Sequence, residues 1–367
     1  MRLLILIFCF AFGSIFAQFN PNGIEQAWVT NTTKKSIELN ELLVVGNVER
    51  TISIDFPEFL DFSKADKAYL PNEPVLVVEI KGETKAYPLS VLIYHQVIND
   101  EIKYIPFCVT FCPTTNSILV YNRRYSHNDK EYMLKFGSSG MYRNGNMVLF
   151  DRNTETWWQQ LTGEAIVGEM HGKTLERYPH LILPYKEYKI NYPNGLVLNP
   201  KTGFKHKYGE TPLPNYENKV RPLYITDSVD LRINPMEKIV VTSFSKNSNV
   251  YPLSKVVNEE VINDNQNDSV RVIFYLKGMV SVLDKEKLSE AKDNGIVTVF
   301  SRKLNEQTLD FYQENGRFYD KQTESEWNIS GWCIEGELKN QQLKKVPYFT
   351  PFSFVWFSFY PKSIVIE

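Results

Sequence analysis

The segment AYPLSVLIYHQVIND, residues 86–100, returns later in the chain as VYPLSKVVNEEVIND at residues 250–264. Three further segments return in the same order at nearly the same offset. They are FDRNTETWW (150–158) with YDKQTESEW (319–327), TGEAIVGEMHGKTLERYP (162–179) with SGWCIEGELKNQQLKKVP (330–347), and YPNGLVL (192–198) with YPKSIVI (360–366). This period is far too long for a solenoid. The sequence therefore predicts two tandem duplicated domains of one fold, residues 71–200 and 236–367, of which the second is degenerate.

The apolar runs within each copy predict a strand-rich fold. VLVVEI at 75–80 and KIVVTSF at 238–244 are expected to open the two copies as strands. Pro88 and Pro252 suit the first turn of a short helix. Because strands outnumber short, scattered helices, we expect an α+β fold of mainly antiparallel β-structure. Further strands are expected at 107–112, 117–122, 132–137, 146–151 and 195–199, then at 270–276, 298–304 and 308–313, with a helix around 185–193.

Two segments lie outside the copies. Residues 18–70 form an amino-terminal extension with two strand-like runs, ELLVVG at 41–46 and TISIDF at 51–56. Residues 201–235 are rich in proline, asparagine and charge, so they are expected to form a connector on the protein surface.

Residues 1–17 have the pattern of a signal peptide. Arg2 precedes the apolar run LLILIFCFAFGSIF, and Ala17 is a small residue before Gln18. No later run has membrane-spanning length, so we expect an exported protein, periplasmic or secreted, without a membrane span. Removing residues 1–17 leaves 40 basic and 43 acidic residues. This near balance gives no electrostatic footprint for nucleic acid, so an unknown small ligand or protein is the expected partner.

The mature chain keeps three cysteines, Cys108, Cys112 and Cys333. An odd number in an exported chain argues against a disulfide framework. If FCVTFC is a strand, Cys108 and Cys112 lie roughly 13 Å apart, which is too far for a disulfide.

Cys112 and His95 form the sharpest candidate site. A thiol beside an imidazole is deprotonated more easily, and it can act as a nucleophile or a soft metal ligand. Cysteine with histidine suits copper or zinc. The second copy has Tyr275 and Glu259 at these positions, so only the first copy could hold such a site. The alternative is that Cys112 is a buried strand-end thiol and His95 a satisfied helix-end histidine. Further candidate metal ligands are Cys108, His127 and His171.

Four other residues are weaker candidates. Glu164 occurs in the first copy only and could serve as a general base or orient His95, although a lone carboxylate is more often a surface residue. FGSSG at 136–140 offers Ser138 and Ser139 to a ligand, or is a tight turn between strands. Arg123 suits an anionic ligand, or is a solvated strand end.

Residues 86–123 and the later segments LKFGSSG, LFDRNTETWWQQLTGEAIVG and YPNGLVLNPKTGFKHKYGETPLPNY resemble the DUF3179 family over about residues 75–220. This resemblance implies an exported bacterial protein of unknown function. His95 and Cys112 fall on the family's histidine and first cysteine, whereas Thr115 stands where the family pattern has its second cysteine. Cysteine and threonine cannot run dithiol exchange or give a metal two thiolates.

Two functional hypotheses remain. The first is an uncharacterised exported protein whose Cys112/His95 site binds a transition metal or carries out thiol chemistry. The second is a non-catalytic exported binding or scaffolding protein with a groove between the duplicated domains. The sequence does not decide whether the protein is an enzyme.

Overall fold

The computed structural model describes residues 28–225, 228–266 and 269–367. The expected signal peptide, residues 1–17, lies outside the described residues. Strands dominate the described chain, most of them paired antiparallel, with five short α-helices, so the α+β, strand-rich prediction is confirmed. No helix among the described residues is long and apolar enough to cross a membrane.

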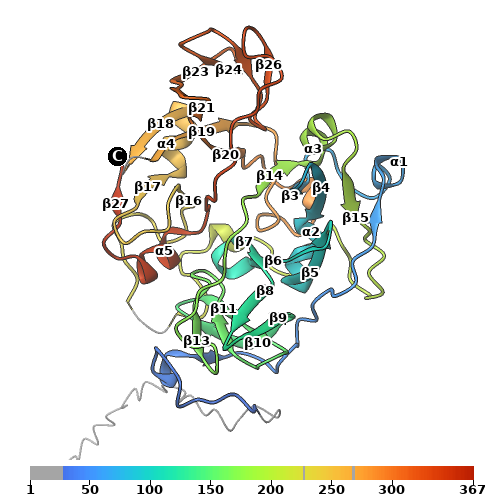
Figure 1. Ribbon diagram of the computed structural model, residues 1–367, viewed down its shortest axis with the longest axis vertical. Coiled ribbons are helices and arrows are strands. Elements are labelled where there is room, and N and C mark those ends of the chain that lie inside the picture. The colour runs from blue at the N-terminus through green and yellow to red at the C-terminus, as the bar shows by residue number, and fades with distance from the viewer. Residues whose placement is uncertain (1–27, 226–227, 267–268) are drawn as a thin grey trace, which may run out of the picture.

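The first half of the chain contains three main sheets (Figure 1). The first has the order β14-β3-β4-β15-β2, in which β15 runs parallel to β4 and the other pairs are antiparallel. The second has the order β5-β6-β7, and the third β1-β10-β11-β12-β13. The strands are β1 (Leu43–Val44), β2 (Phe59–Leu60), β3 (Pro74–Ile80), β4 (Glu83–Pro88), β5 (Val97–Ile102), β6 (Ile105–Cys112), β7 (Ser117–Asn122), β10 (Phe136–Arg143), β11 (Asn146–Asp151), β12 (Trp157–Gln159), β13 (Ala165–Val167), β14 (Leu181–Pro184) and β15 (Leu196–Leu198), with a hairpin of β8 (Arg124–His127) and β9 (Lys130–Met133).

Three helices accompany these sheets, α1 (Phe62–Ala65), α2 (Leu89–His95) and α3 (Tyr185–Asn191). Helix α2 begins after Pro88, whose ring fixes a φ of −60° that suits the helix entrance. It ends at Gln96, which has a left-handed φ of 59° and turns the chain into β5. This turn places His95 on the last helical position, directly before a buried sheet.

The second half repeats much of this order. Sheet β16-β17-β27 again contains one parallel pair, β17 with β27, and helix α4 again follows a proline and ends at a residue with a φ of 59°, Glu260. The elements are β16 (Ile239–Val241), β17 (Asn249–Pro252), β18 (Val261–Gln266), β19 (Ser269–Leu276), β20 (Ile296–Ser301), β21 (Lys303–Leu304), β22 (Gln307–Thr308), β23 (Phe311–Glu314), β24 (Arg317–Asp320), β25 (Glu326–Trp327), β26 (Cys333–Glu335), β27 (Ile364–Val365), α4 (Leu253–Glu259) and α5 (Ser353–Phe359). The duplication itself stays a prediction, as do its domain boundaries.

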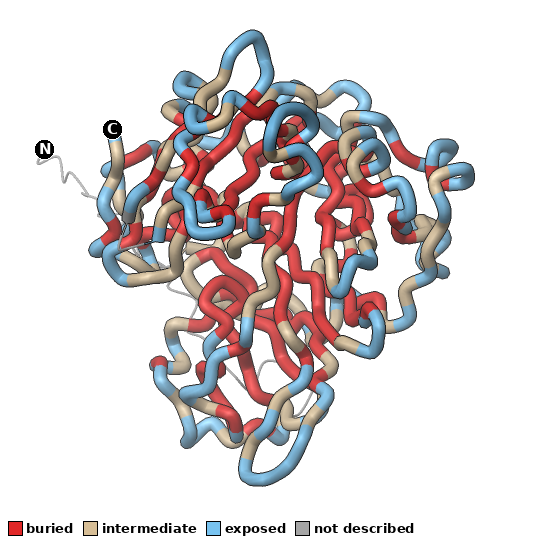
Figure 2. Tube along the Cα trace, turned by 45° about the horizontal axis from the view of Figure 1, so that its top comes forward, coloured by how far each residue is buried: buried red, intermediate tan, exposed pale blue. Residues whose placement is uncertain are grey.

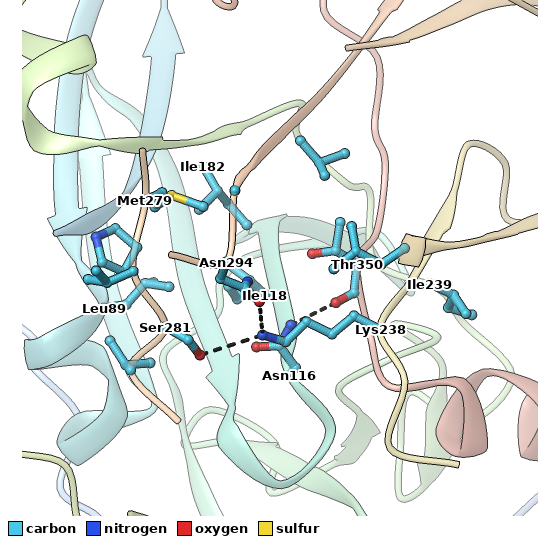
Figure 3. A pocket seen from close by; sticks show the side chains of 16 residues that line it. Leu89, Asn116, Ile118, Ile182, Lys238, Ile239, Met279, Ser281, Asn294 and Thr350 are labelled. Carbon is cyan, nitrogen blue, oxygen red and sulfur yellow. Dashed lines mark hydrogen bonds between the residues drawn. The ribbon is translucent and has the colours of Figure 1, made fainter. Parts of the chain in front are cut away.

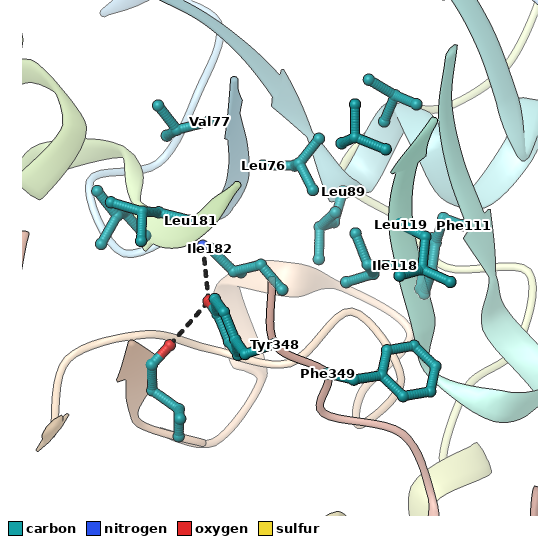
Figure 4. Packing of buried hydrophobic residues seen from close by; sticks show 14 of the residues in the cluster. Leu76, Val77, Leu89, Phe111, Ile118, Leu119, Leu181, Ile182, Tyr348 and Phe349 are labelled. Carbon is teal, nitrogen blue, oxygen red and sulfur yellow. Dashed lines mark hydrogen bonds between the residues drawn. The ribbon is translucent and has the colours of Figure 1, made fainter. Parts of the chain in front are cut away.

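Buried residues run through the interior of both halves, as Figure 2 shows. One apolar cluster contains residues of both halves, including Leu76, Ile182, Tyr348 and Phe349 (Figure 4). The Tyr348 hydroxyl accepts a hydrogen bond from the Ile182 N–H (3.2 Å) and donates one to the Val297 carbonyl (3.0 Å). The two halves therefore share one hydrophobic core, although residues 201–235 separate them in the sequence.

Local expectations failed where tertiary contacts decide the backbone. TISIDF at 51–56 is not a strand, because only Ile54 makes a bridge, to Ile98. FGSSG is not a turn but part of β10, which carries a bulge between Ser138 and Met141. The connector is not confined to the surface, because Tyr216 is fully buried and donates a hydrogen bond to the Thr114 carbonyl (2.8 Å).

Candidate functional site

His95 is fully buried at the end of α2 and both its ring nitrogens have partners. Nδ1 lies 2.8 Å from the Ile52 carbonyl oxygen, and Nε2 lies 2.6 Å from the Tyr208 hydroxyl. A carbonyl can only accept, so Nδ1 carries the proton and the neutral ring accepts the Tyr208 hydrogen bond at Nε2. The Tyr208 oxygen is in turn 2.6 Å from the Thr202 hydroxyl.

Aromatic residues of the connector cover this histidine. The ring centroids of Phe204 and His206 lie 5.1 and 5.3 Å from that of His95, and His206 stacks on Tyr94 at 4.7 Å. Phe204 and His206 are exposed on their outer sides. The structure thus brings a second imidazole to His95.

Burial lowers the pKa of His95, with His206 lowering it further and the Ile52 carbonyl opposing both. The ring is therefore neutral at neutral pH. A neutral imidazole that accepts from a hydroxyl and is held by a carbonyl has the geometry of a general base. The same contacts also serve to fasten the connector onto α2.

Cys112 ends β6 and is fully buried. Its sulfur accepts a hydrogen bond from the Met147 N–H (3.4 Å) and lies 3.2 Å from the Thr114 hydroxyl. Burial raises the pKa of the Cys112 thiol, and these hydrogen bonds offset only part of that effect. In the described chain no hydrogen bond joins Cys112 to His95, and their partners belong to different segments. A Cys112/His95 site stays a prediction.

The residue at the second cysteine position belongs to a buried polar network. The Thr115 hydroxyl lies 2.6 Å from that of Ser117 and accepts a hydrogen bond from Asn146 (3.1 Å). Asn146 also donates to Gln160 (2.8 Å). All four side chains are fully buried, so Thr115 here supports packing between β7 and β11.

The other two cysteines of the described residues are also buried and, like Cys112, form no disulfide. Cys108 lies opposite Asn99 and Tyr121 in its sheet, and burial raises the pKa of its thiol to about 12. Cys333 hydrogen-bonds the Glu335 carbonyl (3.3 Å). Among the described residues, no three histidines, cysteines or carboxylates gather as a metal site. His127 and His171 lie half-buried at other places, in β8 and in a turn.

Glu164 and the two serines have local partners. Glu164 is exposed and accepts a hydrogen bond from the Thr162 hydroxyl (3.2 Å). Ser139 is buried in the β10 bulge and donates to the Val148 carbonyl (2.6 Å), while the Ser138 carbonyl accepts from the Glu49 N–H (2.8 Å). No hydrogen bond in the described residues links Glu164 to His95.

Arg123 is buried, contrary to the expectation of a solvated strand end. Its guanidinium donates three hydrogen bonds to main-chain carbonyls, those of Phe107 (3.0 Å), Leu134 (3.1 Å) and Asp100 (3.2 Å). These bonds tie Arg123 to β5, to β6 and to the segment after β9, so the side chain serves the fold in this conformation.

A pocket lies where the two halves meet (Figure 3). Its cavity volume, counted as the space open to the centre of a water-sized sphere, is about 50 Å³, and the 580 Å³ of atom-free space around it includes open solvent. Most of its walls are apolar, and Lys238, Ser281 and Asn294 gather at one place on it. Its lining residues are Pro74, Leu89, Asn116, Ile118, Ile182, Lys238, Ile239, Leu253, Met279, Val280, Ser281, Val282, Asn294, Gly295, Val297 and Thr350.

Sequence reasoning proposed a groove between the two halves without naming its residues, and it missed the connector cluster of Phe204, His206 and Tyr208 around His95. The connector signal was visible, because GFKHKYGE at 203–210 gathers aromatic residues and a histidine. Lys238 gave a fainter signal as a charge at the head of an apolar strand run. The other lining residues come from separate stretches of the chain between Pro74 and Thr350, which no local pattern connects.

Residues 52–363 match the DUF3179 family, described as a protein of unknown function, and the chain belongs to this family. The match is longer than the expected 75–220 and includes both halves. No curated protein and no solved structure matches this chain. The family therefore supplies no reaction and no ligand.

Proposed function

Starting from a family of unknown function, we propose that this protein is a non-catalytic binding protein for a small, mainly apolar ligand. The pocket between the two halves is the observation that carries this proposal. Apolar walls with a few placed polar groups are typical of small-molecule sites. This was the second of the two hypotheses drawn from the sequence, and the pocket between the two halves supports it.

The chemistry of the lining favours binding over catalysis. The sixteen lining residues include no histidine, cysteine or carboxylate, and their one titratable group is the Lys238 ammonium. That ammonium is already engaged, since it donates to Glu217 (2.6 Å) and Asn294 (3.0 Å). A general base or nucleophile needs a free proton-accepting group, and these side chains offer none.

Toluene tests the proposal as a simple apolar probe. We expect saturable toluene binding in ligand-observed NMR. Leu253→Trp should weaken it at least tenfold, because Leu253 is half-buried at the pocket wall and the larger ring would enter the pocket. Ile190→Trp is the matched control, since Ile190 is 70% exposed and does not line the pocket. Equal binding by wild type and Leu253→Trp would refute the pocket as the site.

A transition-metal site at His95 is the second candidate. The specific observation in its favour is that His206 and Tyr208 both lie against the His95 ring. Two imidazoles and a phenol suit copper or zinc. Cys112 was the partner predicted from sequence, and its burial argues against both metal ligation and thiol catalysis.

Metal content decides between two ligand sets, His95 with His206 and Tyr208, or His95 with Cys112. The protein isolated without chelators is compared with Cys112→Ala and His206→Ala prepared identically. Near-stoichiometric copper or zinc that is lost in His206→Ala but kept in Cys112→Ala would place the metal in the connector cluster. Loss in Cys112→Ala would instead support the Cys112/His95 pair.

Export completes the proposal and rests on residues 1–17 alone. We expect the mature protein to begin at Gln18, in the periplasm or outside the cell. Amino-terminal sequencing of the protein from its own cells tests this, and a retained Met1 would contradict it.

A further inference from the structure

The polar end of the pocket carries no net charge. Lys238 is 8% exposed, and its ammonium forms an ion pair with Glu217 at 2.6 Å. Its two other hydrogen-bond acceptors are the Asn294 Oδ1 (3.0 Å) and, more weakly, the Ser281 hydroxyl (3.5 Å). The Ser281 hydroxyl itself donates to Glu217 (2.7 Å). The three ammonium hydrogens thus have partners, and the positive charge is neutralised.

Two amide groups at the same end keep hydrogen-bonding capacity. Asn116 donates from Nδ2 to the Thr350 carbonyl (2.7 Å), so the nitrogen must face that carbonyl and Oδ1 is the remaining group. Asn294 presents Oδ1 to the ammonium, so Nδ2 is its remaining group. No other protein hydrogen bond of the described residues uses either remaining group. Figure 3 shows both side chains beside the end of Lys238.

On the assumption that the proposed binding function is correct, we propose that the ligand carries a neutral amide head on a branched apolar tail. A carboxamide has one strong acceptor, which suits the Asn294 Nδ2 donor, and an N–H donor, which suits the Asn116 Oδ1 acceptor. The tail would contact Leu89, Ile182, Met279 and Val297 in the apolar part of the pocket.

A charged head is disfavoured by the same contacts. A carboxylate would have to displace Glu217 from Lys238, which would leave the half-buried Glu217 carboxylate without its cation. A ligand ammonium would lie beside the Lys238 ammonium, whose charge Glu217 already neutralises. It would give up its hydration and gain only one acceptor, the Asn116 Oδ1. The pocket should therefore discriminate by the charge of the head between ligands that share the same tail.

Three probes with the same tail test this inference on the full-length mature protein. They are 4-methylpentanamide, 4-methylpentanoate and 4-methylpentylammonium, titrated by NMR at pH 7.5 with toluene as the probe without a polar head. We expect the amide to bind at least tenfold more tightly than either ion. We also expect Asn294→Asp, which keeps the acceptor for Lys238 and removes the Nδ2 donor, to weaken amide binding about tenfold.

Asn153→Asp is the matched control for that variant. Asn153 is exposed, its Oδ1 also accepts one hydrogen bond (from the Lys135 N–H, 3.0 Å), and it does not line the pocket. The Asn153→Asp variant should bind 4-methylpentanamide as tightly as the wild type does. Toluene binding with equal or tighter binding of an ion, or with no binding of the amide, would overturn the amide head while the pocket stands. Failure of all four probes, toluene included, would overturn the pocket and the head together.

Discussion

At the scale of single residues, Glu73 is the buried group with the clearest expected effect on stability. It is 3% exposed, and its carboxylate accepts hydrogen bonds from the Ser90 hydroxyl and the Leu70 N–H (3.2 Å). Burial raises the pKa of Glu73 to about 7, against 4.5 for the free side chain, and these hydrogen bonds only reduce the shift. Between pH 4.5 and pH 7, the folded state therefore keeps the Glu73 proton whereas the unfolded state loses it.

The sign of the pH effect follows from that difference. As pH rises from 4.5 to 7, the unfolded chain loses the proton first, and the folded protein becomes less stable. We expect Glu73→Gln to raise the free energy of unfolding at pH 8 by up to about 3 kcal/mol, from 1.36 kcal/mol per pKa unit. At pH 5 the gain should be much smaller. Urea unfolding at both pH values measures it, with exposed Glu337→Gln as the control. Equal gains at both pH values would contradict the titration of Glu73.

The second prediction at this scale concerns the thiols. Cys108 and Cys112 are fully buried and burial raises the pKa of each, so both are protonated at pH 8. We expect an aromatic disulfide reagent to label neither thiol in the native protein within an hour. Both should react within minutes in 6 M guanidinium chloride. Rapid labelling of native wild type that disappears in Cys112→Ala would show that the Cys112 thiol is accessible. That result would support thiol chemistry at Cys112.

At the scale of elements, the same corner occurs in both halves. Asp151 accepts a hydrogen bond from the Trp158 indole N–H at 2.9 Å, and Asp320 accepts one from that of Trp327, also at 2.9 Å. Each carboxylate also accepts from a threonine three residues later, Thr154 or Thr323. In each half the aspartate and the tryptophan fix one turn. This turn joins β11 to β12 in the first half and β24 to β25 in the second.

These corners give a matched pair of variants. Asp151→Ala and Asp320→Ala should each lower the free energy of unfolding by about 2–4 kcal/mol, because each leaves a buried indole N–H and nearby main-chain donors without a partner. Denaturant titration of both variants measures the loss. A large effect of one variant and none of the other would argue that the corners are not equivalent, and would weaken the case for duplication.

The sequence predicted those elements whose structure is determined by residues close together in the chain. Pro88 and Pro252 marked the two short helices, and the apolar run FCVTFC marked β6, which is buried on both faces. TISIDF alternates like a strand but finds a partner only at Ile54, because sheet pairing is decided by distant residues. The β10 bulge escaped prediction for the same reason. There Gly140 adopts a φ of 77° close against Gly46, where a side chain would clash.

The candidate site was less predictable than the fold. His95 was found from sequence, but the residues that define its chemistry, Tyr208 and His206, lie more than a hundred positions away. Arg123 resembled a surface charge because its three carbonyl partners are main-chain atoms, which leave no trace in the sequence. The pocket requires both halves and their relative placement, so no single segment could show it.

At the scale of the whole molecule, the two halves should unfold together. Their apolar residues form one cluster, and Tyr348 joins them through Ile182 of the first half and Val297 of the second. Separation of the halves would expose this surface to water, at roughly 25 cal/mol for each Å² of apolar area. The pocket lies at the same junction, so its shape depends on the two halves staying together.

The last prediction follows from this shared core. We expect one calorimetric transition for residues 18–367, and fragments 18–235 and 236–367 that do not fold separately. Tyr348→Ala should lower the free energy of unfolding by about 3–5 kcal/mol without splitting the transition. Tyr348→Phe, which removes only the two hydrogen bonds of the hydroxyl, should cost about 1–3 kcal/mol. Two separate transitions, or a stable 236–367 fragment with native-like circular dichroism, would show that the halves are independent domains. The pocket would then open and close with their relative motion.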